Sequence, residues 1–285
     1  MPEIAEVRVV ATTLKKQILN KRIKQIKVLY PKMVTGDINI LKDKTFKDIK
    51  TFGKWIIFNF DEISLLSHLR MEGKYFYEQS TNPIEKHTHI IFSLDNNYDL
   101  RYNDTRKFGK MIICQTKEIY NLKEIKKLGL EPDSIDLNET YLLDKLKNKN
   151  KCIKDLLLDQ TIINGLGNIY ANEVLYAAKI NPLKKGKDIN KKEAINIIKN
   201  SKEITDDSFK KGGSSIKSYT SSLGVEGTYQ NYLKVHKKEG QPCPSCNKKI
   251  ERIKISGRST YFCKNCQKWF ILKKYYVIIY DRRWV

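Results

Sequence analysis

Residues 153–182 read IKDLLLDQTIINGLGNIYANEVLYAAKINP, and this stretch decides how the chain is organised. Its apolar spacing predicts one helix over 153–160 and a second over 168–179, and Gly165 and Gly167 break the helical pattern between them. A helix that begins at Asn168 presents unpaired backbone N–H groups, which form a ready site for phosphate. The alternative is an ordinary capping turn between two helices, and the stretch alone does not decide between them.

The chain before this stretch is rich in β-strand patterns. Glycines and other turn residues separate the short apolar runs, which favours a β-sandwich or barrel. These runs lie at 22–30, 54–60, 62–70, 74–78, 89–94 and 110–115. An apolar step of three or four over 3–21 predicts an amphipathic helix that begins almost at residue 2. A further helix is expected over 191–205, and the Gly/Ser-rich segment 211–236 is expected to be a mobile loop.

The chain has 285 residues, enough for about two domains. Its 54 Lys and Arg against 32 Asp and Glu give a net charge of +22, which favours a polyanionic partner, nucleic acid first. The alternative is a solvated surface in a lysine-rich composition. No run of 18 apolar residues occurs, and Glu3 and Glu6 stand where a secretory peptide would be basic or apolar. We therefore expect a cytoplasmic monomer without a membrane span.

Four of the six cysteines form two pairs with 16 residues between them: Cys243, Cys246, Cys263 and Cys266. In a reducing compartment this spacing is typical of a tetrahedral structural zinc site. The alternatives are four unconnected buried thiols and a catalytic zinc, although no activating Glu is evident nearby. Cys114 and Cys152 are expected to be small buried side chains.

The segment between the cysteine pairs predicts a β-hairpin around Ser256-Gly257. Arg258 would stand at its tip, where a guanidinium is suited to phosphate, and an ordinary surface charge is the alternative. Asn247, directly after the first pair, is expected to adopt a positive φ, which Asn tolerates better than most residues.

Pro2 and Glu3 acquire meaning as a pair. Removal of Met1 would expose a secondary amine with a pKa of about 8, so part of it is unprotonated at neutral pH. The unprotonated amine could form an iminium with a sugar aldehyde. The alternative is a plain helix start, with Pro in the first turn and an acid that favours the helix dipole.

Taken together, these segments resemble the bacterial formamidopyrimidine-DNA glycosylases, which excise oxidised purines such as 8-oxoguanine and also cut the strand. The resemblance runs from Met1 to about Gln267 and rests on ordered blocks: MPEIAEV, FGKW, SHLRMEGKY, HTHIIFSL, LRYNDTRKFG, LLDQTIINGLGNIYANEVLYAAKINP, GGSSI and GRSTYFCKNCQ. It implies an α+β multidomain fold in which an N-terminal helix packs on a β-sandwich. A helical domain with a helix-two-turn-helix motif and a C-terminal β-hairpin zinc finger follow, and DNA lies in the cleft between the halves.

The resemblance also implies the domain boundaries. We expect the helix and β-sandwich catalytic domain at 1–116, and the helical domain with a lesion-covering loop at 117–236. A four-cysteine zinc finger is expected at 237–270, and a C-terminal extension of unknown role at 271–285. The extension is aromatic and basic, so it would either add a strand to the zinc module or contact DNA.

Roles for single residues follow from the same resemblance. Pro2 would be the nucleophile at the sugar C1′, and Glu3, supported by Glu6, the acid that assists base departure before β,δ-elimination. Lys54, Asn168 and Arg258 match the residues that hold the phosphates flanking the lesion, and Lys54 and Arg258 are counted with the catalytic machinery. The expected partner is duplex DNA with oxidised purines or abasic sites, and one structural Zn²⁺ is the expected cofactor.

The gap left by the extruded nucleotide would be filled by Met71, Arg106 and Phe108, with His68 as a further DNA contact.

The chain departs from the family pattern at three places. Ala5 stands where Pro is usual, Asn172 where Asp is common, and VHKKEG at 235–240 where Val-Tyr-Gly-Arg-x-Gly is usual. Two other functions remain open. One is a relative resembling endonuclease VIII, which acts on oxidised pyrimidines, and the other is a zinc-containing DNA-binding protein without chemistry.

Overall fold

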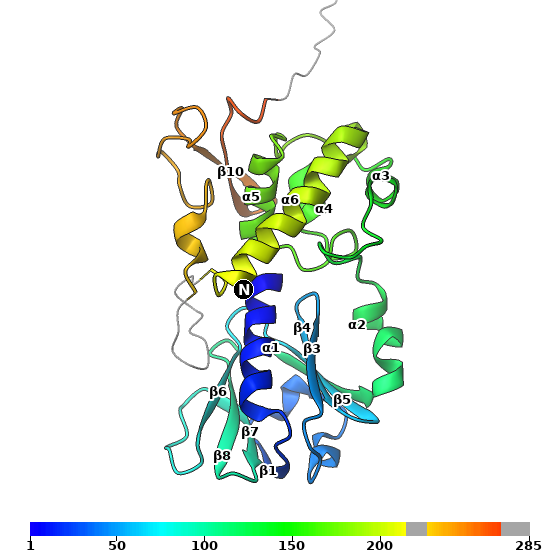
Figure 1. Ribbon diagram of the computed structural model, residues 1–285, viewed down its shortest axis with the longest axis vertical. Coiled ribbons are helices and arrows are strands. Elements are labelled where there is room, and N and C mark those ends of the chain that lie inside the picture. The colour runs from blue at the N-terminus through cyan, green and yellow to red at the C-terminus, as the bar shows by residue number, and fades with distance from the viewer. Residues whose placement is uncertain (215–226, 269–285) are drawn as a thin grey trace, which may run out of the picture.

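The computed structural model describes residues 1–214 and 227–268. Its first half is a sandwich of two β-sheets (Figure 1). The four-stranded sheet has the order β1 (Ile23–Val28), β7 (Thr88–Leu94), β8 (Tyr98–Asn103), β6 (Lys74–Gln79), with antiparallel neighbours. The five-stranded sheet has the order β2 (Val34–Thr35), β9 (Lys110–Gln115), β5 (Ile63–His68), β4 (Trp55–Phe60), β3 (Asp48–Phe52), in which only β2 and β9 run parallel.

Helix α1 (Ile4–Ile18) joins this sandwich to the second half of the molecule. Its buried face, with Val10, Leu14 and Ile18, belongs to the core between the sheets. Ala5, at its start, packs instead in the core of the helical domain. One amphipathic helix therefore holds both domains together, and the N-terminus lies at their junction (Figure 1).

The helical domain contains α3 (Glu139–Leu146), α4 (Ile153–Leu157), α5 (Asn168–Ala177) and α6 (Lys191–Lys210), while the short α2 (Lys123–Lys126) precedes it. Helix α4 ends three residues earlier than expected, because the Asp159 carboxylate accepts the N–H of Thr161 at 3.0 Å and turns the chain. Five 3₁₀ turns complete the described elements: Pro31–Met33, Ile38–Leu41, Thr116–Asn121, Gly186–Asp188 and Tyr229–Tyr232. No helix of the described ranges is long and apolar enough to cross a membrane.

The cysteine module contains the expected hairpin. Strands β10 (Glu251–Ile255) and β11 (Arg258–Phe262) pair antiparallel around Ser256 and Gly257, both with positive φ. Two consecutive positive φ values are what a two-residue hairpin turn requires. The α+β fold with sandwich, helical domain and zinc-finger hairpin is thus confirmed.

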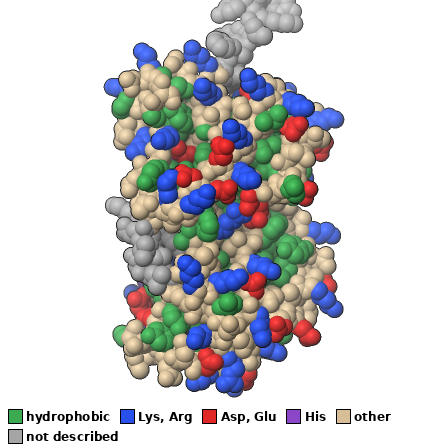
Figure 2. Space-filling view, in the orientation of Figure 1, with side chains coloured by type: hydrophobic (Ala, Val, Ile, Leu, Met, Phe, Trp, Pro, Cys, Tyr) green, Lys and Arg blue, Asp and Glu red, His purple; other side chains and the backbone are tan. Residues whose placement is uncertain are grey.

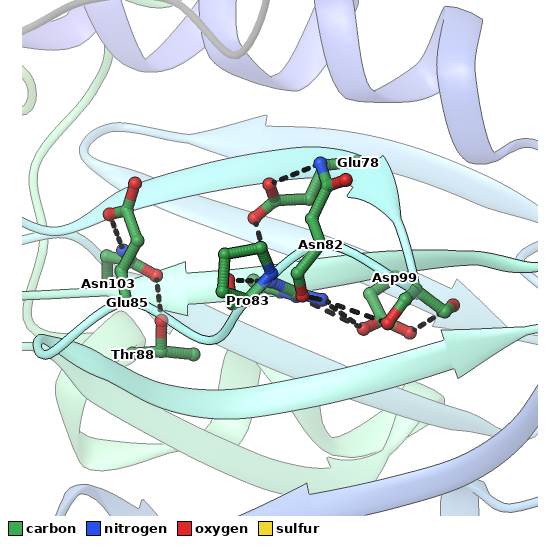
Figure 3. A network of polar contacts seen from close by, with 9 residues as sticks. Glu78, Asn82, Pro83, Glu85, Thr88, Asp99 and Asn103 are labelled. Atoms are coloured by element: carbon green, nitrogen blue, oxygen red, sulfur yellow. Dashed lines mark hydrogen bonds and ion pairs between the residues drawn. The ribbon is translucent and has the colours of Figure 1, made fainter.

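Strand β8 is one that apolar spacing did not predict. Its polar residues lie on the face of the sheet away from the sandwich core, where the connection between β6 and β7 covers and binds them (Figure 3). The buried Arg101 guanidinium binds Asp99 at 2.9 Å and the carbonyl of Pro83 at 2.9 Å, and Asn103 binds Glu85 at 3.0 Å. Charges that are paired in this way can be buried, because each has a hydrogen-bonding partner.

Positive side chains occur on both halves of the molecule. Figure 2 shows Lys and Arg over the helical and the β half of the visible face, with Asp and Glu among them. The net charge is therefore not gathered in one patch of that face.

Candidate active site at the domain junction

The buried carboxylate of Glu3 caps helix α5. It accepts the N–H groups of Gly167 at 2.7 Å, Ile169 at 2.9 Å and Tyr170 at 3.2 Å. These three donors are paired with a carboxylate of the chain itself, which favours the capping turn over a phosphate site at this helix start. Glu3 therefore links the N-terminus to the start of α5.

Lys54 reaches the same place from the tip of the β3–β4 hairpin. Its Nζ donates to the carbonyl of Leu166 at 2.8 Å, and the side chain is buried. Burial lowers the pKa of Lys54 to about 8, against the opposing charges of Glu3 and Glu6. Burial raises the pKa of Glu3, although Lys54 and the backbone donors oppose the shift. Burial thus shifts the pKa of each group in the direction of its neutral form.

The hairpin tip requires glycine at position 53. Gly53 has a φ of +57°, and a Cβ there would lie 2.0 Å from Oδ1 of Asn164. Its N–H donates to the carboxylate of Glu131 at 2.6 Å. The tip therefore docks directly on the α4–α5 turn, and this contact brings Lys54 to Leu166.

Glu6 connects the N-terminus to the base of the Gly/Ser-rich segment. One oxygen accepts the N–H of Glu3 at 2.9 Å, and the other accepts the N–H and hydroxyl of Ser214 at 2.8 and 2.9 Å, together with the hydroxyl of Tyr170. Ser214 and Thr228 form a β-bridge, so both ends of the segment lie side by side. Residues 215–226 themselves, for which a lesion-covering role is expected, lie outside the described residues.

Asn168 and Arg258 complete the expected phosphate-binding group. The Asn168 amide donates to the carbonyl of Ser259 at 3.0 Å, which ties the start of α5 to the hairpin. Arg258 is exposed next to it, and its charge contributes to lowering the pKa values of Lys54 and Lys154. Three segments far apart in sequence thus bring Lys54, Asn168 and Arg258 to one end of α5.

Met71 and Phe108 stand on the surface of the sandwich at the junction. Their side chains are 38% and 53% exposed, so they are not core residues. Together with Met1, Arg70 and Lys107 they line an open pocket of about 620 Å³. The Arg106 guanidinium lies 4.7 Å from the centre of the Phe108 ring, a cation–π distance.

His68 is placed differently from its neighbours in this group. Its ring is buried edge-on against Trp55, and Nδ1 accepts the N–H of Arg70 at 3.0 Å. Burial lowers the pKa of His68 to about 3, so the ring is neutral. In this geometry His68 shapes the turn before Met71 rather than presenting a charge to phosphate.

The four cysteines converge as a metal site requires. Their sulfur atoms all lie within 4.8 Å of one another, with 3.8 Å between Cys243 and Cys266 and 3.5 Å between Cys246 and Cys263. Tetrahedral Zn–S bonds of about 2.3 Å place sulfurs about 3.8 Å apart, so the residues fit zinc. Asn247 has the expected positive φ of 58°. Cys114 and Cys152 are half-buried rather than buried.

Sequence reasoning missed a buried lysine at the centre of the junction. Lys154 is fully buried, and its Nζ donates to the carbonyl of Asn168 at 3.1 Å and to the side chain of Asn172. Burial lowers the pKa of Lys154 to about 7. In the sequence it stands with Asp155 among the apolar residues of α4, and nothing there marks it as buried.

The β-sandwich, the helix-two-turn-helix domain and the four-cysteine module meet near the buried side-chain carboxyl of Glu3. This arrangement defines the zinc-finger class of DNA repair glycosylases. Family models agree along the chain: the formamidopyrimidine-DNA glycosylase N-terminal domain matches residues 1–111, the corresponding H2TH domain 128–220, and the zinc finger found in FPG and IleRS 240–268. The chain belongs to the formamidopyrimidine-DNA glycosylase family.

Individual relatives support this assignment over almost their whole length. Formamidopyrimidine-DNA glycosylases of Ligilactobacillus salivarius and Mycoplasma mobile are each 41% identical, over 94% of this chain and 99% of theirs. Two solved structures of Lactococcus lactis FPG cover 94% of this chain and 100% of their own. The variant bound to Fapy-dG DNA has a TM-score of 0.89 at 39% identity, and the complex with abasic-site DNA has 0.88 at 40%.

Proposed function

We propose that the chain is a bifunctional glycosylase that excises oxidised purines, such as 8-oxoguanine and formamidopyrimidines, from duplex DNA through a Pro2 imine. It then cleaves the strand at the abasic site by β,δ-elimination, and it acts in the cytoplasm on the nucleoid. The observation that carries the proposal is the buried Glu3 carboxyl, directly after Pro2, at the start of α5.

The chemistry requires a free amine at Pro2. With Met1 attached, the Pro2 nitrogen is an amide and cannot attack, so Met1 must be removed. The amine then bonds to C1′ as the base leaves, and the iminium acidifies the C2′ proton, whose loss expels the 3′ phosphate. Burial lowers the pKa of the terminal amine at Met1. The same surroundings would favour the unprotonated amine at Pro2.

Glu3 is suited to carry the proton. A carboxyl whose pKa is raised by burial holds a proton closer to neutral pH and can donate it to the departing base or the opening sugar. Lys54, Asn168 and Arg258 would hold the flanking phosphates, which positions the duplex without reading its sequence. Met71, Arg106 and Phe108 would fill the gap, since the base must leave the stack to be attacked.

The decisive experiment traps the intermediate. Intact-mass measurement should show loss of Met1, and borohydride should link the protein covalently to DNA with 8-oxoguanine or an abasic site. A variant with a retained N-terminal extension should not be trapped. Glu3→Gln should lose base excision more than cleavage at a preformed abasic site. If the blocked protein is still trapped, Pro2 is not the nucleophile and a lysine must take that role.

A comparison of excision rates separates the remaining alternatives. The proposal expects faster excision of 8-oxoguanine opposite cytosine than of thymine glycol, whereas the endonuclease VIII type of activity reverses this order. Binding alone is not sufficient, because one Lactococcus lactis FPG structure contains an oxidised pyrimidine in its DNA. A protein that binds without chemistry would release no base from either duplex.

A further inference from the structure

Two neighbouring connections run from one sheet to the other at the domain junction. The first crossover, residues 69–73, runs from β5 to β6, and the second crossover, residues 104–109, runs from β8 to β9. His68 and Lys110 are partners in the five-stranded sheet, where the first crossover begins and the second ends.

The other two ends meet in the same way. Lys74 and Asn103 are partners in the four-stranded sheet, at the end of the first crossover and the start of the second. The crossovers are therefore anchored on paired strands at both ends. The first carries Met71, and the second carries Phe108.

Asp104 fastens the second crossover. It is 1% exposed, and its carboxylate accepts the N–H of Arg106 at 3.0 Å with one oxygen and the N–H of Gly109 at 2.7 Å with the other. Its carbonyl accepts the N–H of Lys107 at 3.2 Å. One buried side chain thus holds both ends of the segment that carries Arg106 and Phe108.

Tyr102 lies beneath both crossovers. A Cβ at Gly109 would lie 1.8 Å from its hydroxyl oxygen, and one at Gly73 would lie 2.2 Å from it. Burial raises the pKa of Tyr102, and the charge of Asp104 and a hydrogen bond to its side chain add to the shift. The buried ring leaves no room for a Cβ at either glycine, so Tyr102 is placed to support both crossovers.

A single hydrogen bond joins the crossovers at the surface. The hydroxyl of Thr105 donates to the carboxylate of Glu72 at 2.6 Å. Thr105 precedes Arg106, and Glu72 follows Met71. The bond therefore links the two crossovers next to the side chains that would enter the duplex.

We propose that the two crossovers enter the duplex as one rigid wedge, whose two prongs are the first and the second crossover. Asp104 and Tyr102 act as positioning residues, and the hydrogen bond from Thr105 to Glu72 links the two prongs. This rests on the proposed function, in which Met71, Arg106 and Phe108 fill the gap. Two prongs already ordered in the free protein lose little conformational freedom on insertion, so insertion is favoured.

The first test separates base extrusion from chemistry. Asp104→Asn keeps one acceptor and loses the charge. Extrusion can be followed by fluorescence of 2-aminopurine placed beside 8-oxoguanine. We expect it to slow by about tenfold, the usual scale for a hydrogen bond to a charged group, while cleavage of preformed abasic DNA is retained. Asp99→Asn is the matched control, since Asp99 is a buried carboxylate on β8, the strand before the second crossover, and it binds Arg101 instead of a crossover N–H (Figure 3). Equal losses on both substrates, or equal effects of the two variants, would overturn the proposal.

The second test measures coupling between the prongs with milder changes. A double-mutant cycle of Met71→Ala and Phe108→Ala on extrusion should be non-additive in the wild type and additive in Thr105→Val. Thr105→Ser, which keeps the hydroxyl, should restore the coupling. Coupling that is unchanged in Thr105→Val would show that the prongs act separately. Borohydride trapping of the wild type on abasic DNA, measured in parallel, tells this failure apart from failure of the proposed function.

Discussion

The side-chain nitrogen of Asn172 lies 2.8 Å from Nδ1 of His236. An amide nitrogen only donates, so Nδ1 of His236 is the acceptor and the imidazole proton lies on Nε2. Both residues stand at positions where we expect the chain to depart from the family pattern, and the contact joins these two positions. On its other side, the Asn172 oxygen accepts a hydrogen bond from the buried Lys154, which therefore has a neutral partner.

Stability should rise with pH because of Lys154. The pKa of Lys154 is about 7 in the folded protein and 10.5 ordinarily, so between these pH values the unfolded chain binds more protons than the folded one. The free energy of unfolding therefore increases as pH rises through this range. Unfolding in urea at pH 7 and pH 9 should show a larger gain for the wild type than for Lys154→Met. Asn172→Asp should reduce the gain, because a carboxylate holds the lysine proton. The same pH dependence in wild type and Lys154→Met would contradict this account.

DNA affinity should fall as pH rises through about 8, the pKa of Lys54. Above that value the side chain loses the charge that a phosphate contact requires. Lys54→Gln should bind more weakly at pH 7 and should lack this component of the pH dependence. Lys50→Gln is the control, since Lys50 is an exposed lysine on the same hairpin. Fluorescence anisotropy at pH 7 and 9 would check both variants.

Loss of one zinc ligand should abolish DNA binding. The module of about 30 residues depends on the metal for its folding free energy, and its hairpin carries Arg258. Cys263→Ser should lose its zinc and its affinity, whereas Cys114→Ser, a half-buried cysteine of the sandwich, should keep one zinc per chain. Elemental analysis with a binding titration measures both. A metal-free preparation with full activity would refute the structural role.

Arg258→Ala should weaken binding to damaged and undamaged duplexes alike. A phosphate contact adds about one unit to the slope of log affinity against log salt, so the slope should become shallower by about that amount. Arg252→Ala, on the neighbouring strand and paired with Glu239 at 3.1 Å, is the matched control. Titrations at several salt concentrations with an unchanged slope would exclude the contact.

Regular elements with a clear apolar period were predictable from sequence. The N-terminal helix, helices α5 and α6, six strands and the hairpin at Ser256-Gly257 lie where the patterns placed them. Strand β8 did not show this signal, because polar residues alternate with its two core residues. Asp99, Arg101 and Asn103 lie on the face away from the sandwich core and are buried by the connection between β6 and β7. The end of α4 depended on a local bond of Asp159, which apolar spacing does not report.

By itself, the sequence determined the chemical inventory and the order of the domains: the four zinc ligands, the Pro2-Glu3 start and the glycine-interrupted helix pair. Only the tertiary structure decided what these groups touch. Glu3 accepts backbone N–H groups at the start of α5, His68 is buried and neutral, and Asn172 contacts His236. The reason is physical: periodicity reports which face of an element is buried. Contacts between residues far apart in the sequence, and the pKa shifts that burial causes, arise only when the elements pack against one another.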